Sequence, residues 1–261
     1  MGTYLDRILE HHRSVAGSDT RDTRTLTEEC LGLGPTRGFR AALESGDTLA
    51  VISEVKRRSP SKGDLAADLD PARLARTYGS AGASCLSVLT DGPHFGGSSE
   101  DLQAARAAVE LPVLRKDFTV SANDVLDARL MGADAVLLIA AALDDAELSA
   151  FASLARSVGL DVLFEVHDEA EVSRVDGLAD VDLVGVNQRD LVTFEVDRER
   201  AVRVAESIPS TVVRVAESGV RGHEDAVALA AAGYHAVLVG EHLVTADDTA
   251  GAVAGLRVPR R

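Results

Sequence analysis

The chain has 261 residues, 46% of them hydrophobic and 3% aromatic, with a formal net charge of -15 at pH 7. This length suits one large domain, and α/β barrels commonly reach it. The acidic balance excludes nucleic acid and anionic membranes as partners for the surface as a whole. A small anion can still be bound where basic residues gather locally.

The sequence carries no signal for a membrane span, secretion or a disulfide framework. No run of about 18 apolar residues occurs, and residues 1–7 are polar. Two cysteines, Cys30 and Cys85, argue against a disulfide framework, and we place both in structural positions. We expect a cytoplasmic monomer without a membrane or nucleic-acid partner.

Three helical patterns open the chain, over residues 4–15, 25–33 and 39–43. The first has an apolar stripe. None of the three belongs to a strand–helix alternation. Residues 1–46 are therefore predicted to be a helical N-terminal extension of a barrel at 47–261, and residues 1–261 to form one domain.

From residue 49 onward, apolar strand runs alternate with helical patterns. The predicted strands are 49–55, 84–89, 113–116, 135–139, 161–165, 183–187, 212–216 and 236–239. The predicted helices are 71–82, 123–131, 144–158, 168–175, 197–208, 222–232 and 247–256. Eight strands at the spacing of βα units predict an α/β fold, a (β/α)8 TIM barrel. A doubly wound sheet would need a glycine-rich turn after its first strand, and residues 55–60 do not supply one.

The first predicted strand ends in charged residues. Glu54 and Lys56 are two residues apart, so in a strand they project to the same face. A basic loop with hydroxyl groups follows at 57–63. Taken alone, this pair fits a structural ion pair as well as a functional site.

Polar side chains recur at the other strand ends. In a barrel the chemistry lies at the carboxyl ends of the strands, so we expect these side chains to meet at one mouth. Six of the eight ends contribute, through Glu54 and Lys56, Lys116, Glu165, Asn187, Glu217 and the 240–242 stretch.

Two loops and several cations predict a phosphorylated substrate. Ser218, Gly219 and Gly240 follow the seventh and eighth strands, where barrels often bind phosphate through backbone N–H groups. These glycines also fit plain tight turns. Positive charge at the same mouth suits a dianionic small molecule, and it comes from Lys56, Lys116 and Arg189.

Neither a metal site nor a histidine centre is predicted. Lysines lie between the glutamates that could bind Mg²⁺, and they compete with that role. Four histidines are expected on helix or loop surfaces, namely His11, His12, His223 and His235. Three are expected near the mouth, namely His94, His167 and His242.

Motifs run in order through all eight βα units. They are EVKRRSPS at 54–61, LTD at 89–91, FGGS at 95–98, LRKDF at 114–118, EVH at 165–167, VNQRDL at 186–191, AESG at 216–219 and GEHLV at 240–244. Together with the helical extension, they resemble the indole-3-glycerol-phosphate synthase family. The resemblance implies a cofactor-free lyase of tryptophan biosynthesis, which converts 1-(2-carboxyphenylamino)-1-deoxyribulose 5-phosphate to indole-3-glycerol phosphate, CO₂ and water.

The resemblance also implies roles for the matching residues. Lys116 matches the general acid of ring closure, and Glu165 matches the general base of the later dehydration. Lys56 matches a lysine that binds the substrate and its phosphate and serves as a second acid; which lysine serves which step stays open. The residues that match a role in positioning these groups and the sugar hydroxyls are Glu54, Asn187 and Glu217. Arg189 matches the residue that holds the carboxylate of the substrate, and Phe95 and Phe118 match apolar walls around its ring. Further substrate contacts are expected from Ser59 and Leu191. The phosphate loops contain Ser218, Gly219 and Gly240.

The chemistry sets one further expectation. A lysine with a pKa of about 10.4 is a weak acid at neutral pH, so we expect burial and nearby Lys56 to lower the pKa of Lys116. Gln188 and His242 stand where the family typically has smaller residues. We expect them to change affinity and to leave activity in place.

Three alternatives remain open at this point. A phosphoribosylanthranilate isomerase-like barrel would need a Cys or Asp acid–base pair, and neither cysteine falls at a strand end. An aldolase would use Lys116 as a Schiff-base nucleophile. A non-catalytic paralogue would bind a phosphorylated ligand without turning it over.

Overall fold

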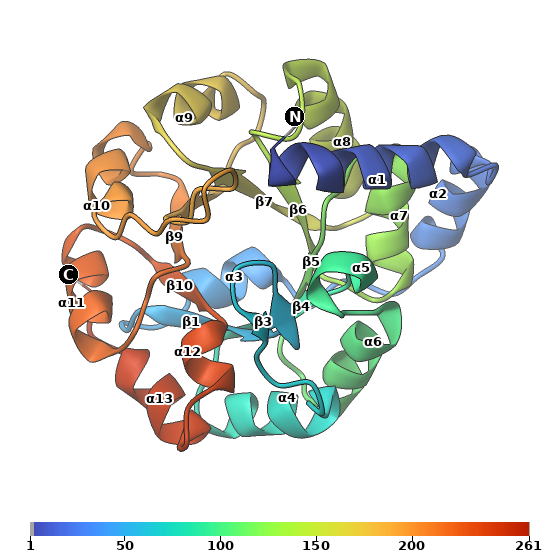
Figure 1. Cartoon of the computed structure of the whole chain (residues 1–261). Helices are drawn as coiled ribbons and strands as arrows, with labels where there is room; N and C mark the ends of the chain where they lie inside the picture. The colour runs from blue at the N-terminus through green and yellow to red at the C-terminus, as the bar shows by residue number, and fades with distance from the viewer. Residues whose placement is uncertain (1–2, 261) are drawn as a thin grey trace.

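Eight parallel strands close into a barrel (Figure 1). In the computed structural model, which describes residues 3–260, they pair in the order β1-β10-β9-β8-β7-β6-β5-β4, and β4 pairs with β1. Their bounds are β1 Ala50–Val55, β4 Cys85–Leu89, β5 Val113–Lys116, β6 Ala135–Ile139, β7 Asp161–Val166, β8 Leu183–Asn187, β9 Val213–Glu217 and β10 Ala236–Val239. The predicted TIM barrel is confirmed, with every strand end within one residue of its predicted position.

The strands are buried on both faces because helices cover the outside of the barrel. Every residue of β4, β6, β8 and β10 is buried. Such strands show continuous runs of Val, Leu and Ala without polar alternation. Because the strands are parallel, their carboxyl ends open at one mouth, where the polar residues begin.

A ring of helices surrounds the barrel. Its members are α4 Pro71–Ser80, α6 Ser99–Ala108, α7 Ala122–Leu130, α8 Asp145–Ser157, α9 Glu169–Asp176, α10 Arg200–Val204, α11 His223–Ala231 and α13 Thr249–Leu256. Acidic or hydroxyl side chains cap most of them; Asp144, for example, accepts the Glu147 N–H at 2.8 Å. Short elements at the mouth complete the set, namely the hairpin β2 Arg58–Ser59 and β3 Gly63–Asp64, α5 Gly92–Phe95, η1 Ala205–Ser207 and α12 Glu241–Val244.

Three helices differ from the prediction by three residues or more. Helix α1, Tyr4–Ser18, continues three residues past its predicted end at 15. Helix α6 was not among the predicted helices. The helix predicted at 197–208 is wrong at its start, since α10 begins at Arg200 and gives way to a 3₁₀ turn. The N–H of Asp197 instead donates to the Gln188 carbonyl at 2.9 Å, so Asp197 belongs to the loop after β8.

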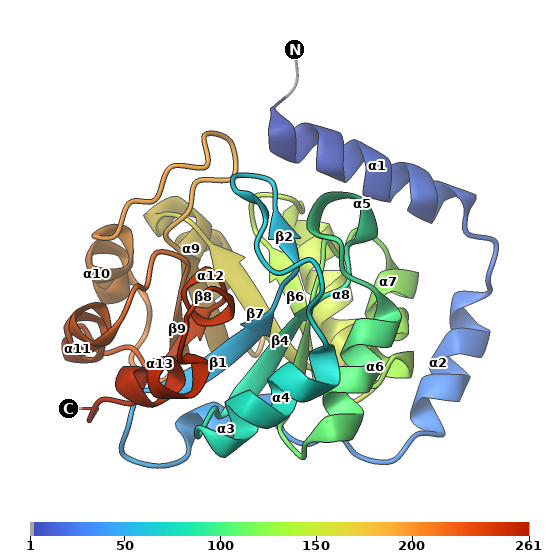
Figure 2. The same cartoon turned by 60° about the horizontal axis from the view of Figure 1, so that its bottom comes forward.

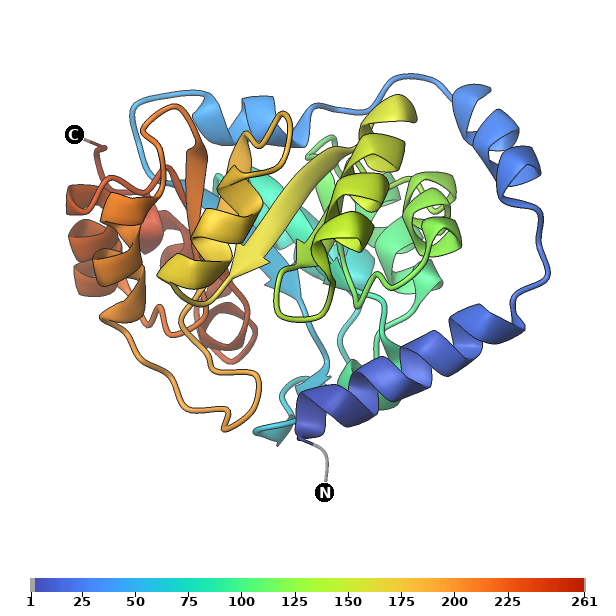
Figure 3. The same ribbon diagram turned by 90° about the horizontal axis from the view of Figure 1, so that it is seen from above.

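The N-terminal segment wraps around the barrel. Helix α1, Tyr4–Ser18, lies across the mouth; α2, Thr23–Leu31, packs beside α7; and α3, Phe39–Glu44, covers the opposite end (Figures 2 and 3). The boundary at residue 46 stays a prediction, and residues 1, 2 and 261 of the predicted domain lie outside the described residues. Within residues 3–260, no helix is long and apolar enough to span a membrane.

Candidate active site

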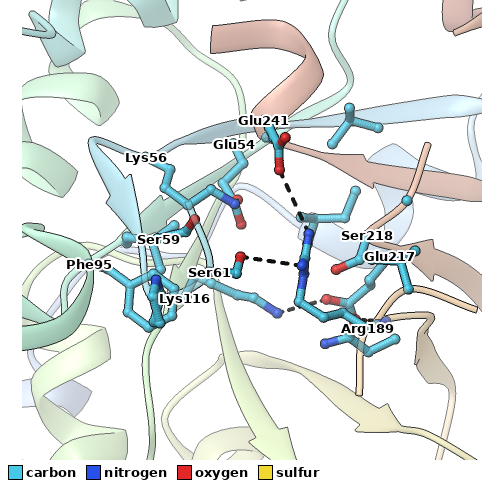
Figure 4. Close-up of a pocket in the computed structure, with 18 of the residues that line it drawn as sticks. Glu54, Lys56, Ser59, Ser61, Phe95, Lys116, Arg189, Glu217, Ser218 and Glu241 are labelled. Carbon is cyan, nitrogen blue, oxygen red and sulfur yellow. Dashed lines mark hydrogen bonds and ion pairs between the residues drawn. The ribbon is translucent and has the colours of Figure 1, made fainter. Parts of the chain in front are cut away.

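A pocket of about 630 Å³ opens at the carboxyl ends of the barrel strands. Figure 4 shows side chains from several strand ends pointing into it. Its lining brings together every site residue predicted from the sequence, namely Glu54, Lys56, Ser59, Phe95, Lys116, Phe118, Glu165, Asn187, Arg189, Leu191, Glu217, Ser218, Gly219 and Gly240.

Lys116 joins three strands at the floor of the pocket. From the end of β5, its Nζ donates to Glu165 Oε2 on β7 at 2.6 Å and to Glu217 Oε2 on β9 at 2.7 Å. Both glutamates are only 1% exposed. A proton donor and two carboxylates are thus held in contact, away from bulk water.

These contacts reverse the expected pKa shift of Lys116. Burial opposes its charge, but nearby glutamates, Glu165 and Glu217 foremost, outweigh burial and raise the pKa of Lys116 well above its ordinary value. The expectation that burial and Lys56 lower this pKa is therefore wrong. Lys56 has its own counter-charge, because its Nζ lies 2.5 Å from Glu54 Oε1. In the resting site, Lys116 is a fully charged donor.

The two carboxylates beside Lys116 differ in protonation. Burial raises the pKa of both. At Glu165, the charges of Lys116 and His167 outweigh burial and hold the pKa at about 2, and Asn187 Nδ2 donates to Glu165 Oε1 at 2.9 Å. At Glu217, burial and repulsion from Glu165 outweigh Lys116 and raise the pKa to about 7. Glu165 is therefore the ionised base of the pair.

Glu54 and Lys56 form a second acid–base pair at the end of β1. Glu54 is 3% exposed, and Ser87 Oγ of β4 donates to its Oε2 at 3.4 Å. Gly240, at the end of β10, leaves the space that this pair occupies, since a Cβ there would collide with Glu54 Oε1 and lie 3.0 Å from Lys56 Nζ. A side chain at 240 would therefore displace the pair.

Arg189 connects the loops that follow β1, β8 and β10. The basic loop after β1 folds into the β2–β3 hairpin, and Ser61 lies at its turn. Arg189, after β8, donates through Nη1 to Ser61 Oγ at 3.3 Å, and its Nη2 lies 3.7 Å from Glu241 Oε2 after β10 (Figure 4). The guanidinium is thus positioned at the pocket to meet an anionic group.

The loop after β9 turns sharply at the pocket wall. Ser218 and Gly219 both have left-handed backbone conformations, with φ of 63° and 73°. Gln188 lies behind this loop, outside the pocket lining, and its Nε2 donates to the Ser218 carbonyl at 2.8 Å. His242 does line the pocket. Of the two unusual residues, Gln188 therefore supports the loop, while His242 faces the space available to a ligand.

Several lining residues were missed by the sequence analysis. Three are cations, namely Lys62, Arg198 and Arg221. Arg221 follows Gly219 by two residues and Lys62 lies in the basic loop, so their motifs were a usable signal. Phe194 and Arg198 lie in the long irregular loop after β8, where Phe194 falls outside every predicted element and Arg198 was assigned to the helix predicted at 197–208.

Two of the four histidines expected on the surface, His12 and His235, are partly buried. The side chain of His12 is 16% exposed, and its Nε2 lies 2.9 Å from Asp91 Oδ2. His235 is also partly buried, and its Nδ1 accepts the Arg214 N–H at 3.1 Å. Only the apolar stripe of helix α1 was interpreted, and no sequence pattern indicated that a polar residue on α1 would contact the barrel.

The comparisons with known proteins agree with this site. The indole-3-glycerol phosphate synthase family model matches residues 5–256. A protein named indole-3-glycerol phosphate synthase from Mycobacteroides abscessus is 47% identical over 257 residues, covering 98% of this chain and 94% of that protein. Indole-3-glycerol phosphate synthase 1 of Streptomyces coelicolor is 53% identical over 255 residues, covering 97% and 94%.

Solved structures with low sequence identity share the barrel fold. Thiamine phosphate pyrophosphorylase from Pyrococcus furiosus aligns with a TM-score of 0.57 at 16% identity, over 80% of this chain and 93% of that one. N-acetylmannosamine-6-phosphate 2-epimerase from Clostridium perfringens aligns with a TM-score of 0.59 at 12% identity, over 81% and 93%. The chain belongs to the indole-3-glycerol phosphate synthase family, and the predicted activity, a carboxy-lyase of tryptophan biosynthesis, is confirmed.

Proposed function

We propose that the pocket converts 1-(2-carboxyphenylamino)-1-deoxyribulose 5-phosphate to indole-3-glycerol phosphate, with Lys116 and Glu165 as its central acid and base. The observation that carries the proposal is the position of Lys116 Nζ, 2.6 Å from Glu165 Oε2 and 2.7 Å from Glu217 Oε2. A proton donor and a proton acceptor within hydrogen-bond reach of one reacting group are what a dehydration needs.

Ring closure places negative charge on the oxygen of the ribulose carbonyl as the ring carbon attacks it. Lys116 meets this charge with an ammonium whose raised pKa keeps it protonated in the resting site. A fixed cation in a buried site stabilises such an oxyanion without reorganisation and can then supply its proton. Loss of CO₂ follows, and the electron pair of the broken bond returns to the ring.

Dehydration removes a proton from carbon and a hydroxyl group as water. Glu165 is ionised and takes the proton, and a lysine protonates the leaving hydroxyl group. Lys56, paired with Glu54 at 2.5 Å, is the second cation at the pocket.

The remaining lining residues hold the two ends of the substrate. Arg189 binds the carboxylate of the aromatic ring, and the ring packs against the apolar wall that Phe95 and Phe118 form together, with their centroids 6.4 Å apart. Ser59 and Leu191 complete this end. The phosphate binds at the opposite wall. It accepts hydrogen bonds from the backbone N–H groups of Ser218, Gly219 and Gly240 and meets the ammonium of Lys56.

The test is product formation from purified protein without added metal or cofactor, followed by indole fluorescence. Lys116→Met and Glu165→Gln are compared with the surface controls Arg24→Met and Glu28→Gln, whose side chains are 79% and 65% exposed. We expect product from the parent and both controls. Each site variant should lose roughly 100-fold or more in kcat, as removal of a general acid or base does.

Tight, phosphate-dependent binding without product in the parent would contradict the proposal and indicate a non-catalytic paralogue. Turnover retained in Lys116→Met would instead move the acid to Lys56. We also propose that the enzyme works as a monomer in the cytoplasm. In support, all the predicted site residues meet in one pocket of a single chain, so the site needs no residue from a second copy. Light scattering of the purified protein measures the oligomeric state.

A further inference from the structure

Three potential metal ligands meet at the rim of the mouth, apart from the Lys116 cluster. His12 Nε2 on α1 and His94 Nδ1 on α5 each lie 2.9 Å from Asp91 Oδ2. The three ligand atoms lie within 4.8 Å of one another, and no second cluster of this kind occurs within residues 3–260. The cluster joins the N-terminal segment to the barrel.

We propose that His12, Asp91 and His94 bind a divalent transition-metal ion of the zinc type, which pins α1 to the mouth of the barrel. Two imidazole nitrogens and a carboxylate oxygen are an ordinary zinc ligand set, with one position left for water or another ligand. Ligand atoms of a tetrahedral zinc ion lie about 3.3 Å apart, given zinc–ligand distances near 2.0 Å. The two spacings of 2.9 Å need to open by only a few tenths of an ångström.

The carboxylate of Asp91 is already fixed in the orientation that a ligand needs. Its Oδ1 caps α5, accepting the His94 N–H at 2.6 Å and the Phe95 N–H at 3.2 Å. Its Oδ2 is thereby directed to the two imidazoles, and the side chain is fully buried. Ligands held by such outer contacts bind metal more tightly than mobile ones.

Asp117 provides a candidate for the fourth position. Its Oδ1 lies 3.8 Å from His12 Nε2, and the side chain is held by Arg115 Nη2 at 2.9 Å and the Phe118 N–H at 2.8 Å. With neutral imidazoles, two carboxylates and one guanidinium leave a net negative charge, which favours a cation. The side chains of His12 and His94 are 16% and 19% exposed, so an ion can enter from solvent.

A bound ion would strengthen the attachment of α1, whose neighbouring ion pair is weak by itself. Arg13 pairs with Glu147 at 2.7 Å, but the two side chains are 45% and 25% exposed. Ion pairs that face water contribute little to stability. A metal bridge between α1 and α5 would therefore hold α1 over the mouth by a contact that a chelator removes.

The test is thermal unfolding of the chelator-treated full-length chain with ZnCl₂, and with MgCl₂ in parallel. We expect Tm to rise by about 5 °C when zinc is at a hundredfold excess over its Kd. No rise is expected with Mg²⁺, which prefers oxygen ligands. Co²⁺ in place of zinc should produce the visible absorption bands of a tetrahedral site.

His12→Gln and His94→Asn separate metal binding from hydrogen bonding, because the Gln amide takes the place of Nε2 and the Asn amide the place of Nδ1, and both lack the imidazole. Both variants should lose the zinc-dependent rise. His11→Gln is the matched control, since His11 is the exposed neighbour of His12 on α1, and it should keep the rise. The proposal is overturned if the parent shows no rise, if His12→Gln and His94→Asn keep it, or if His11→Gln loses it. None of these measurements uses the substrate, so they stand apart from the proposed function.

Discussion

Gly185 of β8 leaves empty the space that the carboxylate of Glu217 on β9 occupies. A Cβ added to Gly185 would collide with Glu217 Oε1 and would lie 3.2 Å from Leu163 Cδ1. Glu217 also lines the pocket, which is the free volume that a displaced carboxylate would enter. The lack of a side chain at 185 therefore allows Glu217 Oε2 to lie 2.7 Å from Lys116 Nζ.

Gly185→Ala should displace Glu217 from Lys116 and lower kcat/KM by roughly tenfold or more, because misplacement by about 1 Å can cost 100-fold. Gly17→Ala on α1 is the matched control, since a Cβ there meets nothing within 4 Å. Circular dichroism and Tm confirm that both variants are folded. Unchanged kcat/KM in a folded Gly185→Ala protein would show that the contact between Glu217 and Lys116 is not required.

The strands could be predicted from the sequence because each is a continuous apolar run bounded by polar residues. A strand such as β6, Ala135–Ile139, has no competing periodicity, and its bounds were correct. The helix predicted at 197–208 was wrong at its start because Asp197 belongs to the loop after β8. Its N–H donates to the distant Gln188 carbonyl, a contact that no local pattern reveals.

The site residues could be predicted by position, since barrel topology brings the strand ends to one mouth. The ion-pair partners of these residues, and hence the direction of their pKa shifts, could not be predicted from the sequence. Lys116 and Lys56 were expected to act on each other, but the order of strands around the barrel gives each lysine its own glutamate. His12 shows the same limit, because its contact with Asp91 depends on how α1 crosses the mouth.

His167 is expected to tune Glu165 from behind the pocket. Its Nδ1 lies 3.1 Å from Glu171 Oε2, and its buried Nε2 lies 3.7 Å from Glu165 Oε1. Burial lowers the pKa of His167, but the hydrogen bond to Glu171 and the charge of Glu165 outweigh burial and raise it. Positive charge on His167 in turn lowers the pKa of Glu165.

His167→Asn should therefore raise the pKa of Glu165 and move the acid limb of the pH profile of kcat/KM to higher pH. His223→Asn, on the exposed start of α11, is the control and should leave the limb in place. A purely structural role for His167 predicts a different result, namely an equal loss of kcat/KM at every pH. That outcome would contradict the tuning role.

Glu217 should make stability fall as pH rises from 4.5 to 7. Its pKa is raised from 4.5 to about 7, so in this window the folded protein binds more protons than the unfolded chain. The free energy of unfolding then decreases with pH. At 1.36 kcal/mol per pKa unit, the full effect is on the order of 3 kcal/mol.

Denaturant unfolding at pH 5 and pH 7 measures this effect in the parent and in Glu217→Gln. The variant cannot ionise at this position, so its decline between the two pH values should be smaller. Glu28→Gln on the exposed face of α2 should behave like the parent. An equal decline in Glu217→Gln would show that another group titrates in this window.

Asp134 should matter for stability and not for turnover, because it lies at the end of the barrel opposite the mouth. The side chain is fully buried. Its Oδ1 accepts the Arg37 N–H at 2.8 Å, its Oδ2 accepts the Val113 N–H at 2.8 Å, and Arg106 pairs with it. Asp134→Ala should cost about 3–5 kcal/mol of unfolding free energy, since it leaves Arg106 without its buried partner.

At a temperature where it stays folded, Asp134→Ala should retain kcat/KM within about twofold, because residues at this end of a barrel serve stability. Glu110→Ala is the control, with a side chain 98% exposed and 3.8 Å from Arg37 Nη2, and its stability should change by less than about 0.5 kcal/mol. Denaturant unfolding and initial rates on the same samples separate the two properties. A large loss of kcat/KM in folded Asp134→Ala would mean that strain at the start of β5 reaches Lys116 at its other end.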